Sequence, residues 1–365
     1  MKFKANLSVP HTQLLYNLIN PLSKLQPQHS AQSTSNASNA SMSSVNSTIM
    51  YLDDDKMVLS TRGSSHKNDS EGIFCFAELI TTDGIFTSHV IESVERDNAI
   101  LMEVSITQFR TALKGVLSTQ KEASGGGTMS VLNNDHEVNI KLAKRNGGLP
   151  HLCFDVRNPL TYSYNHRNSN YNADNQKTSG IGVNYAIPVT IMKVEELQYH
   201  VPPRLGFPDV QLTLPKERPL RNVVERLRGI SPHLYVEGSM NGILTLRIDS
   251  DGASIRTSFD KLVPIHEDCK STQTQDGNGD GEHGDASQMV MTQEPAKCTV
   301  KVDSKKLHAC LHWQSTLGIS DISSAVLCMF ENEMLVLDVT LNPEIGRFMQ
   351  YIPVHYLSNE EMNFD

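Results

Sequence analysis

Apolar and polar residues alternate along much of this chain, and the alternation predicts a protein built mostly of β-strands. Segments such as 2–9 and 183–192 place an apolar side chain at nearly every second position, as half-buried strands do. The predicted strands of the first half are 2–9, 48–52, 57–61, 73–79, 99–104, 136–143, 152–156 and 183–192. Those of the second half are 209–214, 233–240, 243–248, 254–262, 299–302, 325–330, 334–341 and 348–357.

Four segments repeat apolar residues every three to four positions, which is typical of amphipathic helices. The predicted helices are 11–25, 106–117, 218–230 and 304–316. In the third helix the apolar stripe consists of Leu220, Val223, Val224 and Leu227. Its other side carries Arg218, Arg221, Asn222, Glu225 and Arg226, and segment 216–228 holds five basic residues against two acids. A generic solvated helix face has this pattern, and so does a surface that binds phosphate.

Three stretches contain too few apolar residues to form a packed core. Segments 26–47, 158–180 and 265–296 are rich in Ser, Asn, Gln, Gly and Asp. Such segments bury too little apolar area to offset the entropy of ordering the backbone. We expect them to be disordered loop insertions.

The two halves of the chain show the same order of predicted strands and helices. Ala5, Leu7 and Val9 match Val210, Leu212 and Leu214 at a constant offset, and the helices that follow match as well. Each half ends on a similar strand, which reads Ala-Ile-Pro-Val at 186–189 and Tyr-Ile-Pro-Val at 351–354. Chance matching of common apolar residues is the alternative, but the shared order of elements favours a duplicated domain.

Prolines inside two of the predicted strands restrict where those strands can lie. Pro188 and Pro353 have no backbone N–H to give to a ladder, so each strand is either an edge strand or locally interrupted.

Composition sets the broad class of the protein. The chain has 365 residues, a formal charge of −9 and 38 % hydrophobic residues, which fits two globular domains diluted by polar tracts. We expect a first domain at 1–193, a connector at 194–208 and a second domain at 209–365. The acidic average excludes a surface that is basic throughout, but it permits a local basic stripe. No signal peptide or long apolar run is present, and the six cysteines form no C-x-x-C pair. A soluble protein with reduced thiols, cytosolic or nuclear, is expected.

No catalytic or metal-binding motif stands out in the sequence. The acidic loop that starts at Asp276 opens like an EF-hand but has Ser287 where the bidentate Glu should stand. The acids at 53–55 fall between two predicted strands and are better explained as a turn than as a nuclease centre. His308 and His312 share one helix face, while Cys310 faces the apolar stripe, so the three cannot converge on a metal. The two histidines are then either solvated or directed at phosphate, and we expect neither a metal nor a cofactor.

The whole chain outside the insertions resembles the PCNA-like sliding clamps. Within them it is most similar to the Hus-one subunit of the heterotrimeric nine-one-one DNA-damage checkpoint clamp. The resemblance depends on Met-Lys-Phe-Lys-Ala at 1–5, Ile-Pro-Val at 187–189 and Asn-Val-Val-Glu-Arg-Leu at 222–227. It continues through Ile-Ser-Pro-His-Leu at 230–234 and Asn-Gly-Ile-Leu-Thr-Leu-Arg-Ile at 241–248. The first half departs most from the family pattern.

The resemblance implies an α+β fold of two tandem clamp domains, each with antiparallel sheets and two helices on the inner face of a ring. It implies a non-enzymatic checkpoint subunit in the nucleus, with two clamp-like partners, a clamp loader, checkpoint and repair proteins and duplex DNA without sequence preference, and no membrane. A homotrimeric replication clamp, a metal-dependent nuclease and a β-rich binding module remain as alternatives. The implied DNA-binding residues are Lys24, Arg110, Lys114, Lys216, Arg218, Arg221, Arg226, Lys305, Lys306 and His312. The implied subunit-interface residues are Tyr185, Ile187, Val189, Ile191, Ile255, Thr257 and Phe259.

Overall fold

The computed structural model describes residues 1–25, 47–62, 72–123, 137–145, 147–156, 183–250, 253–265, 295–341 and 345–357. The insertions expected at 26–47, 158–180 and 265–296, with the acidic loop from Asp276, lie outside these residues except at their ends. Among the described residues, which form nine strands in the first half of the chain and eight in the second, no helix is long and apolar enough to span a membrane.

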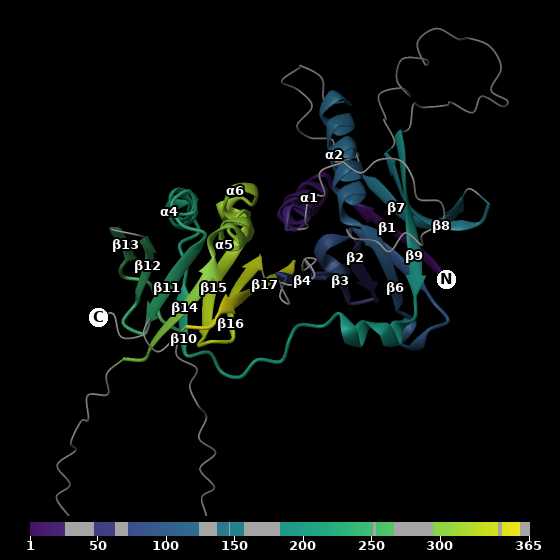
Figure 1. Ribbon diagram of the computed structural model, residues 1–365. Helices are drawn as coiled ribbons and strands as arrows, with labels where there is room; N and C mark the ends of the chain where they lie inside the picture. The colour runs from purple at the N-terminus through teal and green to yellow at the C-terminus, as the bar shows by residue number, and fades with distance from the viewer. Residues whose placement is uncertain are drawn as a thin grey trace, which may run out of the picture.

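The first half contains nine strands and two α-helices, which lie in the order that the sequence predicts apart from one additional strand (Figure 1). They are β1 Lys2–Leu7, α1 Val9–Lys24, β2 Ser47–Leu52, β3 Lys56–Arg62, β4 Phe74–Ile80, β5 Ser88–Glu92, β6 Ile100–Ser105, α2 Ile106–Ala123, β7 Val138–Arg145, β8 Leu149–Val156 and β9 Val183–Met192. The short 3₁₀ helix η3, Val194–Tyr199, begins the connector.

The second half repeats this order with eight strands. They are β10 Val210–Thr213, α4 Pro219–Leu227, β11 His233–Ser239, β12 Ile243–Ser250, β13 Ala253–Phe259, β14 Lys297–Asp303, α5 Ser304–Cys310, α6 Trp313–Thr316, β15 Ile322–Phe330, β16 Met334–Leu341 and β17 Gly346–His355.

All the strand pairings are antiparallel, and they follow the same scheme in both halves. In the first half the ladder runs β5–β1–β7–β8–β9–β6–β2–β3–β4. In the second half β10 pairs with β15, then β16 and β17, while β14 continues from β17 to β11, β12 and β13. The expected α+β architecture of two repeated units is therefore present.

One strand pair joins the two halves into a continuous sheet. β4 of the first half pairs with β17 of the second, from Leu79 opposite Gly346 to Phe74 opposite Tyr351. We call this pairing the seam. On one face of the seam Phe74 and Tyr351 pack with ring centroids 5.7 Å apart, in a small apolar cluster that Leu197 and Leu205 of the connector cover.

The prolines mark the points at which two strands change partners. Residues 183–188 of β9 pair with β8 and residues 189–192 pair with β6, so Pro188 lies at the transfer. Pro353 occupies the same place in β17, between the residues paired with β4 and those paired with β14. The interrupted-strand interpretation is confirmed for both, because the missing N–H falls where one ladder gives way to another.

The helices pack on one face of the sheets, which is the upper side in Figure 1, while the connector runs along the opposite side. Their apolar stripes join the strand side chains in one core, which includes Leu18 of α1, Phe109 of α2, Val224 of α4 and Trp313 of α6. α1 also packs against α5 and α6, so helices of the two halves meet at the seam.

Two elements differ from the sequence prediction. β5 was not predicted, because only Ile91 of its five residues is buried and its hydrophobic signal is correspondingly weak. The single helix predicted over 304–316 is wrong, since α5 ends at Cys310 and α6 begins at Trp313. In an unbroken helix Trp313 would lie about 120° from Leu307, off the buried stripe. The break allows Trp313 to be fully buried.

Gly346 fixes the close approach of the strands at the start of the seam. Its φ is +130°, and a Cβ there would lie 2.1 Å from the Glu78 carbonyl oxygen. We expect Gly346→Ala to cost roughly 2 kcal/mol or more and to lower the melting temperature by about 4–8 °C, because backbone must shift. Gly206→Ala is the control, since nothing lies within 4 Å of the added atom. Equal melting temperatures for the two variants in calorimetry would contradict this account of the seam.

Candidate nucleic-acid interface

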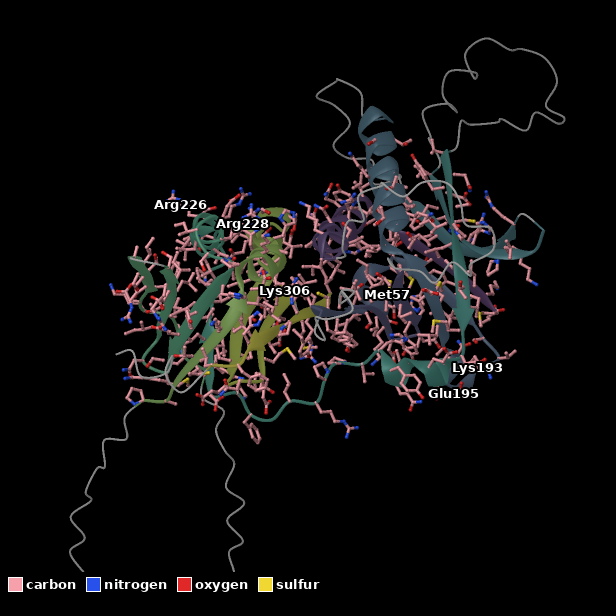
Figure 2. The ribbon with its side chains drawn as sticks, in the orientation of Figure 1. Met57, Lys193, Glu195, Arg226, Arg228 and Lys306 are labelled. Carbon is pink, nitrogen blue, oxygen red and sulfur yellow. The ribbon has the colours of Figure 1, made fainter. Side chains whose placement is uncertain are left out.

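The basic side chains of the second half are presented mainly by α4. Arg218 is its N-cap and Pro219 its first residue, a position where the missing N–H costs nothing. Leu220, Val224 and Leu227 are buried, which turns the opposite side of the helix outward. Figure 2 shows Arg226 and Arg228 on this outer side, and Lys193 and Glu195 across the molecule beside the connector.

The remaining basic residues named from the sequence lie on the same set of helices, with differing exposure. Lys24 ends α1, Arg110 and Lys114 are on α2, and Lys305 and Lys306 start α5. The exposed members are Lys24, Lys114, Arg218, Arg226 and Lys305, and the half-buried members are Arg110, Lys216, Arg221, Lys306 and His312.

Some of these side chains are brought together at the meeting of α1, α4, α5 and α6. Lys24 Nζ lies 2.6 Å from His312 Nε2, which joins the end of α1 to the start of α6. Arg110 of α2 donates from Nη1 to Ser23 Oγ on α1 at 3.1 Å. Arg221 acts electrostatically on Lys24 and His312 alike. Four of the ten residues named from the sequence thus form one group.

Lys216 serves a different purpose. Its Nζ donates to the Ile322 carbonyl oxygen at 2.7 Å and so ties the segment before α4 to β15. This contact uses one of its three donors and directs the ammonium toward the sheet, away from the outer side of α4.

Two residues of the group were missed as DNA-binding candidates in the sequence. Arg228 Nη1 lies 3.0 Å from His308 Nδ1, which links the end of α4 to α5. Arg228 also lies 3.7 Å from Glu225 in an ion pair on α4. The shared helix face of His308 and His312 already allowed both to be directed at phosphate, but only His312 was among the implied DNA-binding residues. Arg228 lies just past the last apolar position of α4, so the helical pattern gave no reason to choose it.

The surroundings keep both histidines neutral. Burial first, and then Lys24, Arg221 and His308, lower the pKa of His312 to about 4. Burial also lowers the pKa of His308, helped by Arg228 and Arg221 and opposed by Glu225. Burial, then Arg221 and Arg110, lower the pKa of Lys24 as well. The group is therefore an electropositive site in which added protons are unfavourable.

No group of three His, Cys, Asp or Glu side chains converges as metal ligands within the described ranges. The acids at 53–55 form the expected turn, in which Asp53 Oδ1 accepts from the backbone N–H groups of Asp55 and Lys56. Cys269 lies outside the described residues, and no disulfide joins any two of the other five cysteines.

The candidate interface strands lie at opposite ends of the protomer. On β9, Ile187 and Val189 are 3 % and 7 % exposed and pack in the protomer's own core. Tyr185 and Ile191 are half-buried, and the Tyr185 hydroxyl lies where a Cβ on Gly115 of α2 would stand. These side chains therefore face inward, and what β9 can offer a neighbour is its backbone and its exposed alternate residues.

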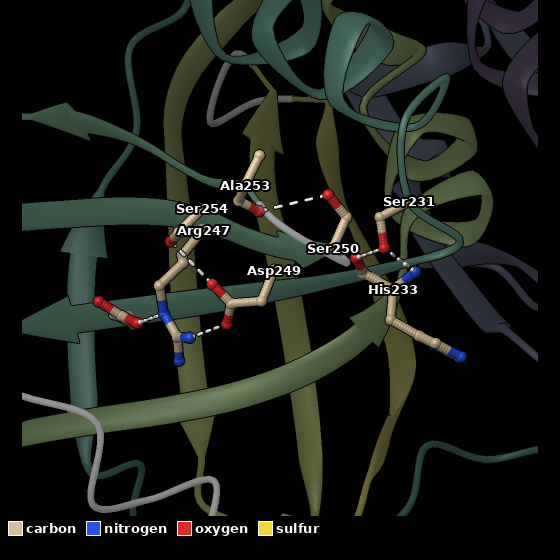
Figure 3. Close-up of polar contacts among 8 residues, drawn as sticks. Ser231, His233, Arg247, Asp249, Ser250, Ala253 and Ser254 are labelled. Atoms are coloured by element: carbon tan, nitrogen blue, oxygen red, sulfur yellow. Dashed lines mark hydrogen bonds and ion pairs between the residues drawn. The ribbon is translucent and has the colours of Figure 1, made fainter.

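β13 is more open than β9. Ile255 is 37 % exposed, Thr257 is half-buried and Phe259 packs partly against the core. β12 and β13 are tied together by Asp249, which accepts from Arg247 and from Ser254 Oγ, the latter at 2.8 Å (Figure 3). Arg247 also pairs with Glu237 and lies over the Tyr235 ring, 4.2 Å from its centroid. This network holds β13 in register on its one paired side.

The arrangement of two repeated units, each with helices on one face of antiparallel sheets, is that of a sliding-clamp protomer. The crystal structure of PCNA from Thermococcus kodakaraensis is similar, with a TM-score of 0.54 and 12 % identity over 97 % of this chain and 100 % of that one. The fold expected from the sequence is confirmed.

The model of the Hus1-like protein family matches residues 1–356, and the chain belongs to this family. The checkpoint protein hus1 homolog of Dictyostelium discoideum is 24 % identical over 80 % of this chain and 84 % of its own length. Checkpoint protein hus1 of Schizosaccharomyces pombe is 24 % identical over 73 % of this chain and 77 % of its own length. Checkpoint protein HUS1 of Homo sapiens is 30 % identical over 22 % of this chain and 29 % of its own length. The resemblance noted in the sequence is confirmed.

The lowered pKa of His312 has a consequence for stability. The unfolded chain binds a proton at this residue near pH 6.5, whereas the folded protein binds it only near pH 4, so stability falls as the pH drops between these values. We expect His312→Gln to reduce this loss, measured as melting temperature against pH.

His89→Gln is the control, because His89 lies on β5 and its Nε2 faces the Asp54 carbonyl oxygen. An equal effect of the two substitutions on the pH dependence would contradict a depressed pKa at His312.

Proposed function

We propose that this chain is a non-enzymatic subunit of a heterotrimeric ring that closes around duplex DNA in the nucleus. Its membership of the Hus1-like family makes it a checkpoint clamp subunit. Such a ring marks DNA damage and recruits checkpoint and repair factors after a clamp loader has placed it on DNA. The relatives are named as checkpoint proteins, which supports a checkpoint role over a replication role.

The observation that carries the proposal is the seam. β4 and β17 pair within the chain, and the internal repeat makes β13 the counterpart of β4 and β9 the counterpart of β17. In the described residues β13 pairs only with β12, and residues 183–188 of β9 pair only with β8. Exposed strand edges are normally covered or paired. A neighbouring subunit that supplied each missing strand would repeat the seam and extend the protomers into a ring.

The proposed interface uses the residues named from the sequence in two ways. Tyr185, Ile187, Val189 and Ile191 hold β9 against its own core, which leaves the strand's backbone edge straight and available. Ile255, Thr257 and Phe259 lie on the more open strand, so their side chains are the ones we assign to contact with a neighbour. Exposed apolar area such as that of Ile255 is the kind of surface that an interface buries.

The proposed DNA contacts are the outer sides of the helices. Lys and Arg side chains that meet phosphates bind duplexes without reading their sequence, which is what a sliding ring requires. A non-enzymatic role is supported by membership of the Hus1-like family, whose relatives are named as checkpoint proteins. No observation favours the nuclease alternative.

Assembly gives the first test of this function. We expect the pure chain to elute from size exclusion with light scattering at its own 40.5 kDa and to form a ring of three only with two other clamp-like chains. Ile255→Asp should abolish that assembly, since a charge would be buried at the edge of β13. Ile243→Asp is the matched control, because Ile243 is 42 % exposed and Ile255 37 %. A ring formed by the pure chain alone would contradict the heterotrimer.

Retention on DNA gives the second test. Replacing Arg218, Arg221 and Lys305 with Glu should abolish retention of the assembled ring on end-blocked duplex while leaving assembly intact. Each lost phosphate contact should flatten the slope of log affinity against log salt by roughly 0.9.

The control for retention reverses three exposed charges that lie away from α1, α2, α4 and α5. They are Lys144 on β7, Lys193 just after β9 and Arg204 in the connector. Equal salt slopes for the two triple variants would show that the helices do not meet the DNA. Loss of the ring itself would show that these residues belong to the subunit interface.

A further inference from the structure

The helices of the two halves meet at a cluster of cations that has almost no acidic partner. Lys24, Arg110, Arg221 and Arg228 carry four positive charges, and Glu225 is the one acid among the described groups that shift the pKa of Lys24, His308 or His312. With both histidines neutral, four positive charges and one negative leave a net +3. We call these residues, with His308 and His312, the junction cluster.

The hydrogen bonds within the junction cluster are unusual for cations. Lys24 donates to His312 Nε2 at 2.6 Å and Arg228 to His308 Nδ1 at 3.0 Å, where a carboxylate or phosphate would be the stronger acceptor. Because these nitrogens accept, both imidazoles are neutral. The proton of His312 is then on Nδ1, which lies 3.2 Å from Ser315 Oγ, and that of His308 is on Nε2.

Two donors of the junction cluster are left without an acceptor. His308 Nε2 and Arg221 Nε are buried and have no hydrogen-bond partner among the described residues. Buried donors of this kind are rare and each requires an explanation. An anion bound among Lys24, Arg221 and Arg228 would provide an acceptor for Arg221 Nε, while His308 Nε2 points to the side of the ring away from Arg228.

We propose that the junction cluster is a binding site for one backbone phosphate of duplex DNA, and that phosphate binding is coupled to protonation of His308 and His312. The proposal deepens the proposed function, because it assigns one particular DNA contact to the helices that would face the DNA inside the ring. A phosphate takes over the donors of Lys24 and Arg228, which frees His312 Nε2 and His308 Nδ1 to accept protons. Each imidazolium can then donate to an oxygen of the phosphodiester, whose single negative charge opposes the burial cost and the repulsion that lower the pKa of both histidines.

Other charged groups near the histidines do not supply the missing anion. On α4, Glu225 is already paired with Arg228. On β14, Asp303 accepts from the backbone N–H groups of Lys305 and Lys306 at the start of α5. On β17, His355 stacks edge-on against His233, with ring centroids 4.7 Å apart, and its pKa is lowered by burial first and then by His233 and Lys306. The two helices of the first half contribute only cations to this site, Lys24 and Arg110.

The test measures histidine titrations in the full chain by NMR, without DNA, with a short duplex and with inorganic phosphate. We expect the duplex to raise the pKa of His312 from about 4 toward its ordinary value. For His312 a rise from about 4 to about 6.5 strengthens binding about tenfold between roughly pH 7.5 and 5.5, and a raised pKa at His308 acts in the same direction. His308→Gln and His312→Gln should each remove their share of this pH dependence, and His89→Gln should not.

The outcomes separate this proposal from the clamp function. If His308 and His312 titrate identically with and without duplex while the Glu triple variant still loses ring retention, the phosphate site is wrong and the clamp function stands. If inorganic phosphate moves these titrations and the duplex does not, the site binds a free anion and its assignment to DNA is wrong. A third outcome is that the Glu triple variant keeps ring retention while the duplex still shifts the histidine titrations. In that case the assignment of the helices to the DNA inside the ring is wrong, and the phosphate site stands.

Discussion

The architecture depends on the backbone pairing of β4 with β17. Six consecutive residue pairs connect strands from opposite halves of the chain, and the core continues across them without a break. The seam fixes how the two helix layers sit, which brings the end of α1 against α5 and α6. Without this pairing, Lys24 and His312 would have no reason to meet, since they come from different repeats. The grouping of charged side chains on the helix face therefore depends on the register of β4 with β17, which lie on the other side of the core.

Internal duplication explains why one pair of edge strands is hydrogen-bonded at the seam while the equivalent edges at the two ends of the protomer are open. The chain contains two copies of each edge strand, and one copy of each is used within the protomer. The other copies, β13 and residues 183–188 of β9, have a partner on one side only in the described residues. Proline placement belongs to the same design, because Pro188 and Pro353 stand where a strand leaves one neighbour for another. The strand pairing that joins the two halves within one chain can therefore be repeated between two protomers, with β13 of one and β9 of the other.

The sequence was informative where hydrophobic periodicity was strong and where the two repeats reinforced each other. The stripe of Leu220, Val224 and Leu227 placed the basic side of α4 correctly, and the prolines of the duplicated final strands marked where those strands change partners. The sequence could not show β5, whose single buried residue leaves no periodic signal, nor the break before Trp313, which tertiary packing imposes on a helical pattern. It could not separate Lys216, tied to β15, from its neighbours on α4. The pairing of Arg228 with His308 depends on how two helices pack, which no local pattern encodes.

The seam also orders events in time. β4 is made long before β17, so the first half has an unpaired strand edge while the chain between the two strands is translated. Contacts so distant in sequence are slow to form, and an open edge can pair with another chain while it waits. A second molecule offering its own β17 would satisfy β4 as well as the native strand does, producing an exchanged dimer. A correct protomer therefore forms only when β4 pairs with β17 of its own chain faster than it meets β17 of another molecule. The long stretch of sequence between β4 and β17 makes this requirement demanding.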